Sequence, residues 1–479
     1  MMTAMKSSRI LIALAAAALA AAPALAGGKT ELRGIWVCPW EMPTPAAVDE
    51  VVDFAASYGF NALFYEVRYR GDAFYTPNKK DRRFPNPEPR ARDLASQPPG
   101  WDPLDNLVAK GHARGLQVHA WVTTFVVANK KTPTPAGHPV AEHPEWLSQT
   151  KTGETWDPYG MAWLDPGLPA VQDYLYNVFM DIVVNYNVDG LHLDYVRYTS
   201  PAFGRNPAAI ARFEAESGVS ADDENAFAAW RREQLNAFVG RLYEGMAKAK
   251  PGCALTTAVF ASRRGTAYND CLQDWTAWLE GGYVDAVAPM AYGRDVGVVT
   301  KQVLDAVGVA RNRYVYAGIM VPEVKDADFD DRVAAETVAK TTAIEDVPAA
   351  GVIVFSYGGL VKKDMLIARA LKKEPFAVAT AAPAMPWKQP FAAREMEVVA
   401  LAVGGEPKYA VLVKDAAPHR YSYLLAKEVS ARTSARVFIK EAGTGGWRVY
   451  AGDYADREAA LDLSRRLEDL GYRNGESQP

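Results

Sequence analysis

The stretch Tyr186–Tyr198, which reads YNVDGLHLDYVRY, is the part of the chain from which the fold is best inferred. Its apolar run predicts a buried strand that ends at Asp194, where charged and aromatic side chains begin. Side chains alternate along a strand, so His192 and Asp194 share one face and the leucines share the other. Because a carboxylate is costly against an apolar layer, we expect Asp194 to face an interior that opens at the strand's end. The alternative is an ion pair between Asp194 and Arg197 that only closes the strand.

The same alternation of a short apolar run and a helical stretch recurs between residues 30 and 372. Eight such pairs predict an α/β protein with a (β/α)8 TIM barrel. A doubly wound open sheet is the main alternative, but no nucleotide-binding glycine motif follows a strand. The long segments 70–102 and 123–167 would follow the C-terminal strand ends, where barrel enzymes place their sites. The expected strands are Glu31–Cys38, Asn61–Val67, Leu116–Val122, 188–194, Ala254–Phe260, Val284–Met290, Tyr314–Ile319 and Val352–Ser356.

Composition and the N-terminal residues bear on the compartment. The 479 residues are 49% hydrophobic and 23% charged, which is typical of a globular protein with a large core. The net charge of -4 gives no reason to expect a nucleic-acid partner. Lys6 and Arg9 precede an apolar run that ends in Ala24-Leu25-Ala26, so residues 1–26 predict a secretory signal peptide. We expect a periplasmic protein with no membrane span after signal removal.

The chain contains three cysteines, Cys38, Cys253 and Cys271. An odd number in an exported protein leaves at least one unpaired. We expect buried free thiols, with a bridge between Cys253 and Cys271 as the alternative. Their spacing does not fit a zinc site, and we expect no metal and no cofactor.

Further polar side chains are expected at the barrel mouth, by which we mean the C-terminal strand ends and the loops that follow them. Alternation places Glu66 and Arg68 on one face of the second strand, so both should face the mouth. An orienting ion pair is the alternative role for Glu66. His119 and Trp121 share a face of the third strand, where His119 is either a hydroxyl-binding or a hydrogen-bonded wall residue. Glu323 follows the seventh strand.

Carboxyl groups together with Arg, His and many loop aromatics favour a carbohydrate ligand, because sugars present both apolar faces and hydroxyls. Glycoside hydrolysis uses two carboxyl groups, one of them protonated. We expect Asp194 to be the nucleophile or base and either Glu66 or Glu323 to be the acid. A metal site of His119, His192 and Asp194 is an alternative without a spacing signature. The expected substrate-binding residues are Arg68, His119, Trp121, His192, Arg197, Trp40, Trp163, Tyr292 and Tyr357.

Five motifs that occur in order resemble the bacterial glycosyl-hydrolase-like family ten over residues 30–370. The resemblance implies a barrel that acts on peptidoglycan glycan strands without stem peptides, with division-site proteins as further partners. It assigns the strand-end aspartate of the family to Asp194, whereas many members have Gln where this chain has Glu66. The motifs are ELRGIWV (31–37), FYEVRYRGDAFY (64–75), GLQVHAW (115–121), WLDPGLPAVQDY (163–174) and VDGLHLDYVRY (188–198).

The C-terminal part is expected to be a separate unit. Residues 373–407 predict a linker in which 398–403 could form a strand, and residues 408–479 predict a β-α-β-β-α domain. The sequence at 447–472 resembles a SPOR domain, which implies binding to peptide-free peptidoglycan strands and tethering of the barrel. The polar tail 473–479 departs from the apolar last strand of that family, so the sheet should lack an edge strand.

The predicted function is therefore a periplasmic glycoside hydrolase of peptidoglycan strands, located at the division septum. Two alternatives remain. One is a glycan-binding envelope scaffold that does not catalyse, and the other is a hydrolase of a different extracellular polysaccharide.

Overall fold

The structure is a computed structural model, and it describes residues 30–388, 398–403, 406–417, 426, 429–430, 433–442 and 446–469. The predicted signal peptide and the polar tail 473–479 lie outside the described residues.

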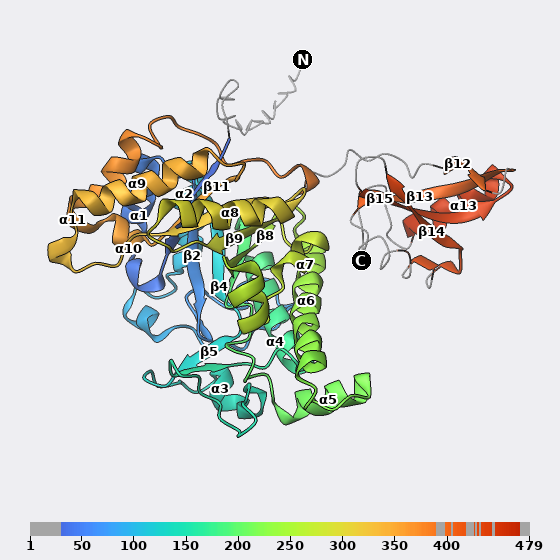
Figure 1. Ribbon diagram of the computed structural model, residues 1–479, viewed down its shortest axis with the longest axis horizontal. Coiled ribbons are helices and arrows are strands. Elements are labelled where there is room, and N and C mark those ends of the chain that lie inside the picture. Colours follow the sequence, from blue (N-terminus) through green and yellow to red (C-terminus); the bar gives the residue numbers. More distant parts are fainter. Residues whose placement is uncertain are drawn as a thin grey trace, which may run out of the picture.

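Eight parallel strands close into a barrel, so the predicted (β/α)8 fold is confirmed (Figure 1). The first strand pairs with both the second and the last, and the sheet therefore has no free edge there. The strands around the barrel are β1 (Leu32–Val37), β2 (Ala62–Tyr69), β4 (Gln117–Thr123), β7 (Gly190–Asp194), β8 (Ala254–Phe260), β9 (Ala286–Met290), β10 (Tyr314–Met320) and β11 (Gly351–Phe355).

A helix follows each barrel strand and covers the outside of the sheet (Figure 1). Local sequence explains where these helices begin. The Thr44 side chain accepts a hydrogen bond from the N–H of Ala47 (3.1 Å), and Pro45 occupies the first helical position. The covering helices are α1 (Pro45–Tyr58), α2 (Pro103–Ala113), α4 (Pro169–Asn185), α6 (Glu224–Ala249), α7 (Trp275–Glu280), α8 (Val296–Ala310), α9 (Asp331–Glu345) and α11 (Lys362–Lys373).

Two apolar layers result from the alternation of side chains along the strands. The larger core lies between the sheet and the helices. The smaller one fills the inside of the barrel and includes Trp36, Phe64, Tyr316 and Ile353. The barrel interior is therefore packed, and polar groups are left to gather at the mouth.

The long loops after β2 and β4 carry short elements of their own. β3 (Asp72–Ala73) pairs antiparallel with the end of β2, and β5 (Val126–Asn129) pairs with β6 (Met161–Trp163). β5 and α3 (Pro139–Glu142) lie at the lower end of the barrel in Figure 1. The other short helices are α5 (Pro207–Ser217) and α10 (Tyr357–Leu360).

The first part of the predicted linker is bound to the barrel at its N-terminal end. The Tyr314 hydroxyl donates to the Ala384 carbonyl (2.6 Å), and the Trp387 indole N–H donates to Asp285 (2.7 Å). Lys388 forms a buried ion pair with the same carboxylate (2.8 Å). We call residues 375–388 the strap.

The C-terminal unit has a four-stranded antiparallel sheet in the order β12-β13-β15-β14. The edge strand β12 comes from within the predicted linker and pairs with β13. The described sheet therefore has an edge strand at this side, although the polar tail was not expected to form one. Leu463 and Leu467 of the helix pack on Val449 and Ala451. The elements are β12 (Val398–Val403), β13 (Glu406–Ala417), β14 (Val437–Ala442), β15 (Gly446–Tyr454) and α13 (Arg457–Asp469).

The expectation for the cysteines is settled by the described coordinates. Cys38, Cys253 and Cys271 are all buried and free, so the alternative bridge does not form. Among the described residues, no helix is long and apolar enough to cross a membrane.

Candidate active site

Glu66 and Asp194 come together at the barrel mouth from strands that lie on either side of β4. Glu66 is opposite Trp121 in the β2–β4 register, and Trp121 is opposite His192 in the β4–β7 register. Asp194 lies two residues farther along β7. Glu66 is 2% exposed and Asp194 is 7% exposed. The strand-end positions predicted for these two carboxyl groups are therefore found.

The surroundings of Glu66 favour its neutral form. Burial raises the pKa of Glu66 well above its usual value, and the charges of Asp194 and Glu41 raise it further. Only Arg70 acts in the opposite direction, and no hydrogen bond from a described residue stabilises the ionised carboxylate. Glu66 is thus suited to hold a proton near neutral pH.

The surroundings of Asp194 are different. Burial raises the pKa of Asp194 as well, but the Arg197 guanidinium and a hydrogen bond from the Tyr195 N–H oppose this effect. The N–H donates to Asp194 Oδ1 over 2.6 Å, and Arg197 Nη1 is 3.7 Å from the same oxygen. The indole N–H of Trp121 makes no hydrogen bond to a described residue, yet it lies close enough to lower the pKa of Asp194 further. These contacts stabilise the ionised form.

Aromatic rings hold Arg197 in place beside Asp194. Its guanidinium lies 4.3 Å from the ring centre of Tyr195 and 4.5 Å from that of Phe260. Trp163, 3% exposed, is 5.8 Å away on the same side. The ion pair that was the structural alternative for Asp194 therefore exists, but it lies within the mouth and does not exclude a chemical role.

Two tyrosines complete the surroundings of Asp194. Tyr195 has a left-handed backbone (φ 52°), which turns the chain directly after the carboxylate. Burial and the Asp194 charge raise its pKa to about 12. Tyr292 stacks on Phe355 (6.0 Å), and burial together with Asp194 raises its pKa strongly. Both hydroxyls stay protonated at neutral pH and can donate hydrogen bonds.

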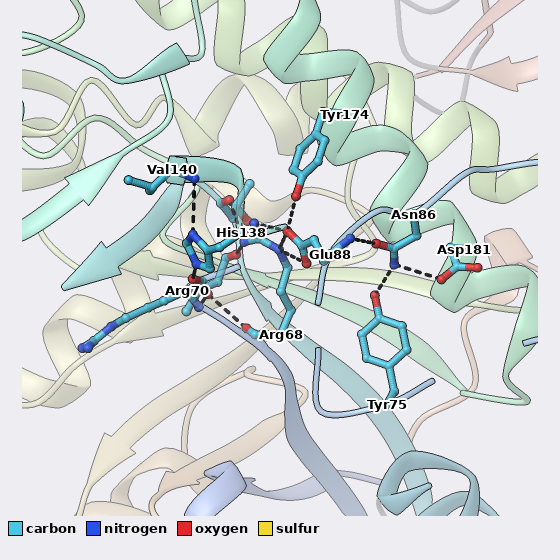
Figure 2. Close-up of polar contacts among 11 residues, drawn as sticks. Arg68, Arg70, Tyr75, Asn86, Glu88, His138, Val140, Tyr174 and Asp181 are labelled. Carbon is cyan, nitrogen blue, oxygen red and sulfur yellow. Dashed lines mark hydrogen bonds and ion pairs between the residues drawn. The ribbon is translucent and has the colours of Figure 1, made fainter. Parts of the chain in front are cut away.

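The expectation that Arg68 faces the mouth is wrong. A register shift between Glu66 and Arg68 interrupts the alternation of β2. Arg68 is fully buried outside the barrel, where its guanidinium pairs with Glu88 (2.6 Å) and the Tyr174 hydroxyl donates to the same carboxylate (2.9 Å). Figure 2 shows this group. The alternative of a Glu66–Arg68 ion pair is therefore wrong as well.

His119 and His192 lie in the packed interior of the barrel. Trp36 Nε1 donates to His192 Nε2 (3.1 Å), so Nδ1 carries the proton and donates to Thr256 (2.8 Å). His119 stacks on Phe64 (4.4 Å), and burial lowers its pKa to about 4. Its ring also contacts Gln117 (3.2 Å). Of the two roles expected for His119, these contacts fit the hydrogen-bonded wall residue and not the residue that binds a substrate hydroxyl.

The remaining candidates differ in placement. Trp40 is 60% exposed and contacts the Tyr69 ring edge-on (5.5 Å). Tyr357 packs against Phe54 of α1, in the outer layer and not across the mouth. Glu323 is exposed in the loop after β10 and is not among the charges that shift the pKa of either buried carboxyl.

Sequence reasoning missed two charged residues at the mouth. Glu41 accepts hydrogen bonds from the backbone N–H groups of Cys38 (2.7 Å) and Gly358 (2.6 Å), and it thereby joins the loops after β1 and β11. Arg70 lies one residue beyond β2 and lowers the pKa of Glu66. Their only sequence signal was a position just after a predicted strand. No group of three His, Cys, Asp or Glu residues in the described ranges could hold a metal ion.

Comparison with known proteins adds sequence relatives. Residues 31–318 match the family described as "Glycosyl hydrolase-like 10". The chain is 24% identical over 294 residues to "Glycosyl hydrolase YngK" of Bacillus subtilis (strain 168), and the aligned region covers 55% of this chain and 54% of that protein. It is 26% identical over 304 residues to "Glycosyl hydrolase DigH" of Escherichia coli (strain K12), and the aligned region covers 57% of this chain and 65% of that protein. The match thus spans less than two thirds of either relative.

Solved structures share the fold at low identity. The PgaB (BpsB) glycoside hydrolase domain from Bordetella bronchiseptica has a TM-score of 0.51 at 12% identity and covers 71% of this chain and 98% of its own. Alpha-L-fucosidase isoenzyme 2 from Paenibacillus thiaminolyticus has a TM-score of 0.52 at 13% identity and covers 72% and 49%. At these identities the likeness concerns the fold alone.

Proposed function

Because the chain belongs to the glycosyl hydrolase-like 10 family, we propose that it hydrolyses glycosidic bonds and that Asp194 and Glu66 are the two reacting carboxyl groups. The observation that carries the proposal is the pairing of two buried carboxyls of which Glu66 has its pKa raised well above the usual value, whereas Asp194 has an arginine and a backbone N–H that oppose the effect of burial. Glycosidases need this division, since one group protonates the leaving oxygen while the other acts as a carboxylate.

In this proposal Glu66 is the general acid and Asp194 is the nucleophile or base. Burial favours the protonated form of Glu66, while Arg197 and the Tyr195 N–H oppose the effect of burial on the pKa of Asp194. Glu323, the other acid considered, is exposed and lies in a loop. Tyr195 and Tyr292 donate hydrogen bonds to substrate hydroxyls, and the exposed Trp40 offers a flat face for a sugar ring.

The proposed substrate is the glycan strand of peptidoglycan without its stem peptides, in the periplasm and at the division septum. The signal-peptide pattern at residues 1–26 and the SPOR-like motif at 447–472 support this choice. In the C-terminal sheet, Val449 and Ala451 face α13, so alternation places Tyr450 on the opposite face, where it stacks on Phe438 (5.5 Å). Within this pair Phe438 is half-buried and Tyr450 is buried, so the proposed glycan-binding surface of the tether is centred on Phe438.

The test is mass spectrometry of soluble products from amidase-treated peptidoglycan. Wild type should release fragments whose ends identify the cleaved bond, and Asp194→Asn should release essentially none. Glu323→Gln is the matched control and should keep full activity. If wild type releases nothing over a broad pH range but still pellets with the glycan, the protein is a binding scaffold. If it instead cleaves another extracellular polysaccharide, the peptidoglycan assignment fails.

A further inference from the structure

Arg70 is held at the mouth by a network of hydrogen bonds to its backbone. The Arg70 N–H donates to Thr123 Oγ1 (3.0 Å), and this hydroxyl donates to the Arg68 carbonyl (3.0 Å). His138 Nε2 donates to the Arg70 carbonyl over 2.7 Å. Nδ1 of the same ring accepts from the Val140 N–H (3.3 Å), so the proton is on Nε2. These contacts stabilise the left-handed backbone of Arg70 (φ 57°).

The Arg70 side chain itself points away from this network, as Figure 2 shows. Its guanidinium lies over the Tyr69 ring (4.4 Å) and is half-buried. It forms no hydrogen bond or ion pair with any residue in the described ranges. It is nevertheless close enough to Glu66 to influence that carboxyl. A cation whose five N–H donors have no partner among the described residues therefore lies near the proposed acid.

We propose that Arg70 binds the free lactyl carboxylate that N-acetylmuramic acid exposes once its stem peptide has been removed. The proposal rests on the function proposed above. Hydrolysis of the amide between sugar and peptide leaves one carboxylate on every second sugar, whereas an intact strand carries a neutral amide there. The planar guanidinium matches a carboxylate in a two-point contact and gains little from an amide. Arg70 thus selects peptide-free strands.

Arg197, the other guanidinium at the mouth, is not equivalent. It is 8% exposed, lies 3.7 Å from Asp194 and is covered by aromatic rings. The Arg197 charge is therefore paired with the Asp194 carboxylate, whereas the Arg70 charge has no ion-pair partner among the described residues and is available to a ligand.

The experiment measures binding in the full chain with Glu66→Gln, which keeps the shape of the neutral acid and should slow turnover by about 10²–10⁴-fold. The ligands are amidase-derived glycan fragments with free carboxyl groups and the same fragments converted to methylamides. Calorimetry at neutral pH should show the acid form binding about tenfold more tightly, as expected for a charge-assisted contact. Adding Arg70→Gln should abolish this preference, and Arg70→Lys should keep part of it. Arg83→Gln, at an exposed arginine paired with Asp81, should change nothing.

Equal affinities for the two ligands in the Glu66→Gln protein would overturn the proposal. So would an Arg70→Gln protein that loses affinity for both ligands equally, or one that keeps the preference. Unchanged thermal unfolding of the Arg70 variants serves as the control for folding. Because binding is read without turnover, failure of this inference is distinct from failure of the proposed hydrolysis, which is read from wild-type products.

Discussion

Glu66 and Asp194 carry the same chemical group on the same face of the barrel, yet their neighbours differ. Glu66 has two carboxyl groups among its nearest charges and only Arg70 to oppose them. Asp194 has Arg197, a backbone N–H and the Trp121 indole. The assignment of acid and base follows from these neighbours and not from residue type.

The pH dependence of activity should report both groups. Activity requires ionised Asp194 and protonated Glu66, so we expect kcat/KM to fall on the acid side as Asp194 gains a proton. It should fall on the alkaline side as Glu66 loses one. Glu66→Gln should lower the rate by about 10²–10⁴-fold and remove the alkaline limb. Initial rates across pH, with Glu323→Gln as control, test this. An alkaline limb that persists in Glu66→Gln would exclude Glu66 as the acid.

The raised pKa of Glu66 also affects folding stability. In the folded state the carboxyl holds its proton above the pH at which it ionises in the unfolded chain. Stability is therefore lost as pH rises from the unfolded pKa towards the folded pKa. Glu66→Gln should raise the free energy of unfolding by about 1 kcal/mol or more at neutral pH, and by little below pH of about 4. Urea unfolding at both pH values measures this, and an equal gain at both would contradict the assignment.

Among the elements, β2 shows how a single irregularity separates two roles. Because of its register shift, the Arg68 side chain lies outside the barrel and pairs with Glu88, whereas the Glu66 side chain lies inside the barrel. The 70–102 loop is joined to the barrel through this pair. Glu88 also accepts from Tyr174 of α4 (2.9 Å), and Asn86 in the same loop donates to Asp181 (2.9 Å) (Figure 2).

Breaking the buried pair from one side should be costly. Glu88→Gln leaves the Arg68 charge buried without a carboxylate, so we expect a loss of about 3–5 kcal/mol in the free energy of unfolding. The double change Arg68→Met with Glu88→Leu should recover much of that loss, because no charge is then stranded. Asp81→Asn, in an exposed pair, should change stability little. Chemical denaturation decides this, and similar unfolding of the single and double variants would refute it.

The same strand shows what the sequence could predict. Short apolar runs were sufficient to predict the barrel strands. A polar residue at the end of a strand was sufficient to predict that Glu66 and Asp194 lie at the mouth. Strict alternation failed at Arg68 because the partner that draws it outward, Glu88, is 20 residues away and belongs to an irregular loop. Arg70 was missed for a related reason. Its position depends on a left-handed backbone held by distant side chains, which no local pattern encodes.

At the scale of the whole molecule, the strap fixes where the chain leaves the barrel. Residues 375–388 lie at the N-terminal strand ends, where Trp387 and Lys388 contact Asp285. Glu66 and Asp194 lie at the opposite strand ends. The connection to the C-terminal unit therefore starts away from the mouth.

If the C-terminal unit tethers the enzyme, its surface should matter only for an insoluble substrate. Phe438 and Tyr450 lie on the sheet face opposite α13, where Phe438 is half-buried and Tyr450 is buried, with Lys440 over the Phe438 ring (5.9 Å). We expect Phe438→Ala to reduce pelleting with peptide-free sacculi, and product release from them, by about tenfold. Soluble fragments of the same glycan reach the mouth by diffusion, so their kcat/KM should not change.

Glu458→Ala, at an exposed position on α13, is the matched control and should leave both substrates unaffected. An equal loss on soluble and insoluble substrate would place the effect of Phe438 in folding or catalysis. No loss on either would mean that the C-terminal sheet does not bind this glycan. A loss confined to sacculi is the result that only tethering predicts, because raising the local concentration of substrate gains nothing where the substrate is already free in solution.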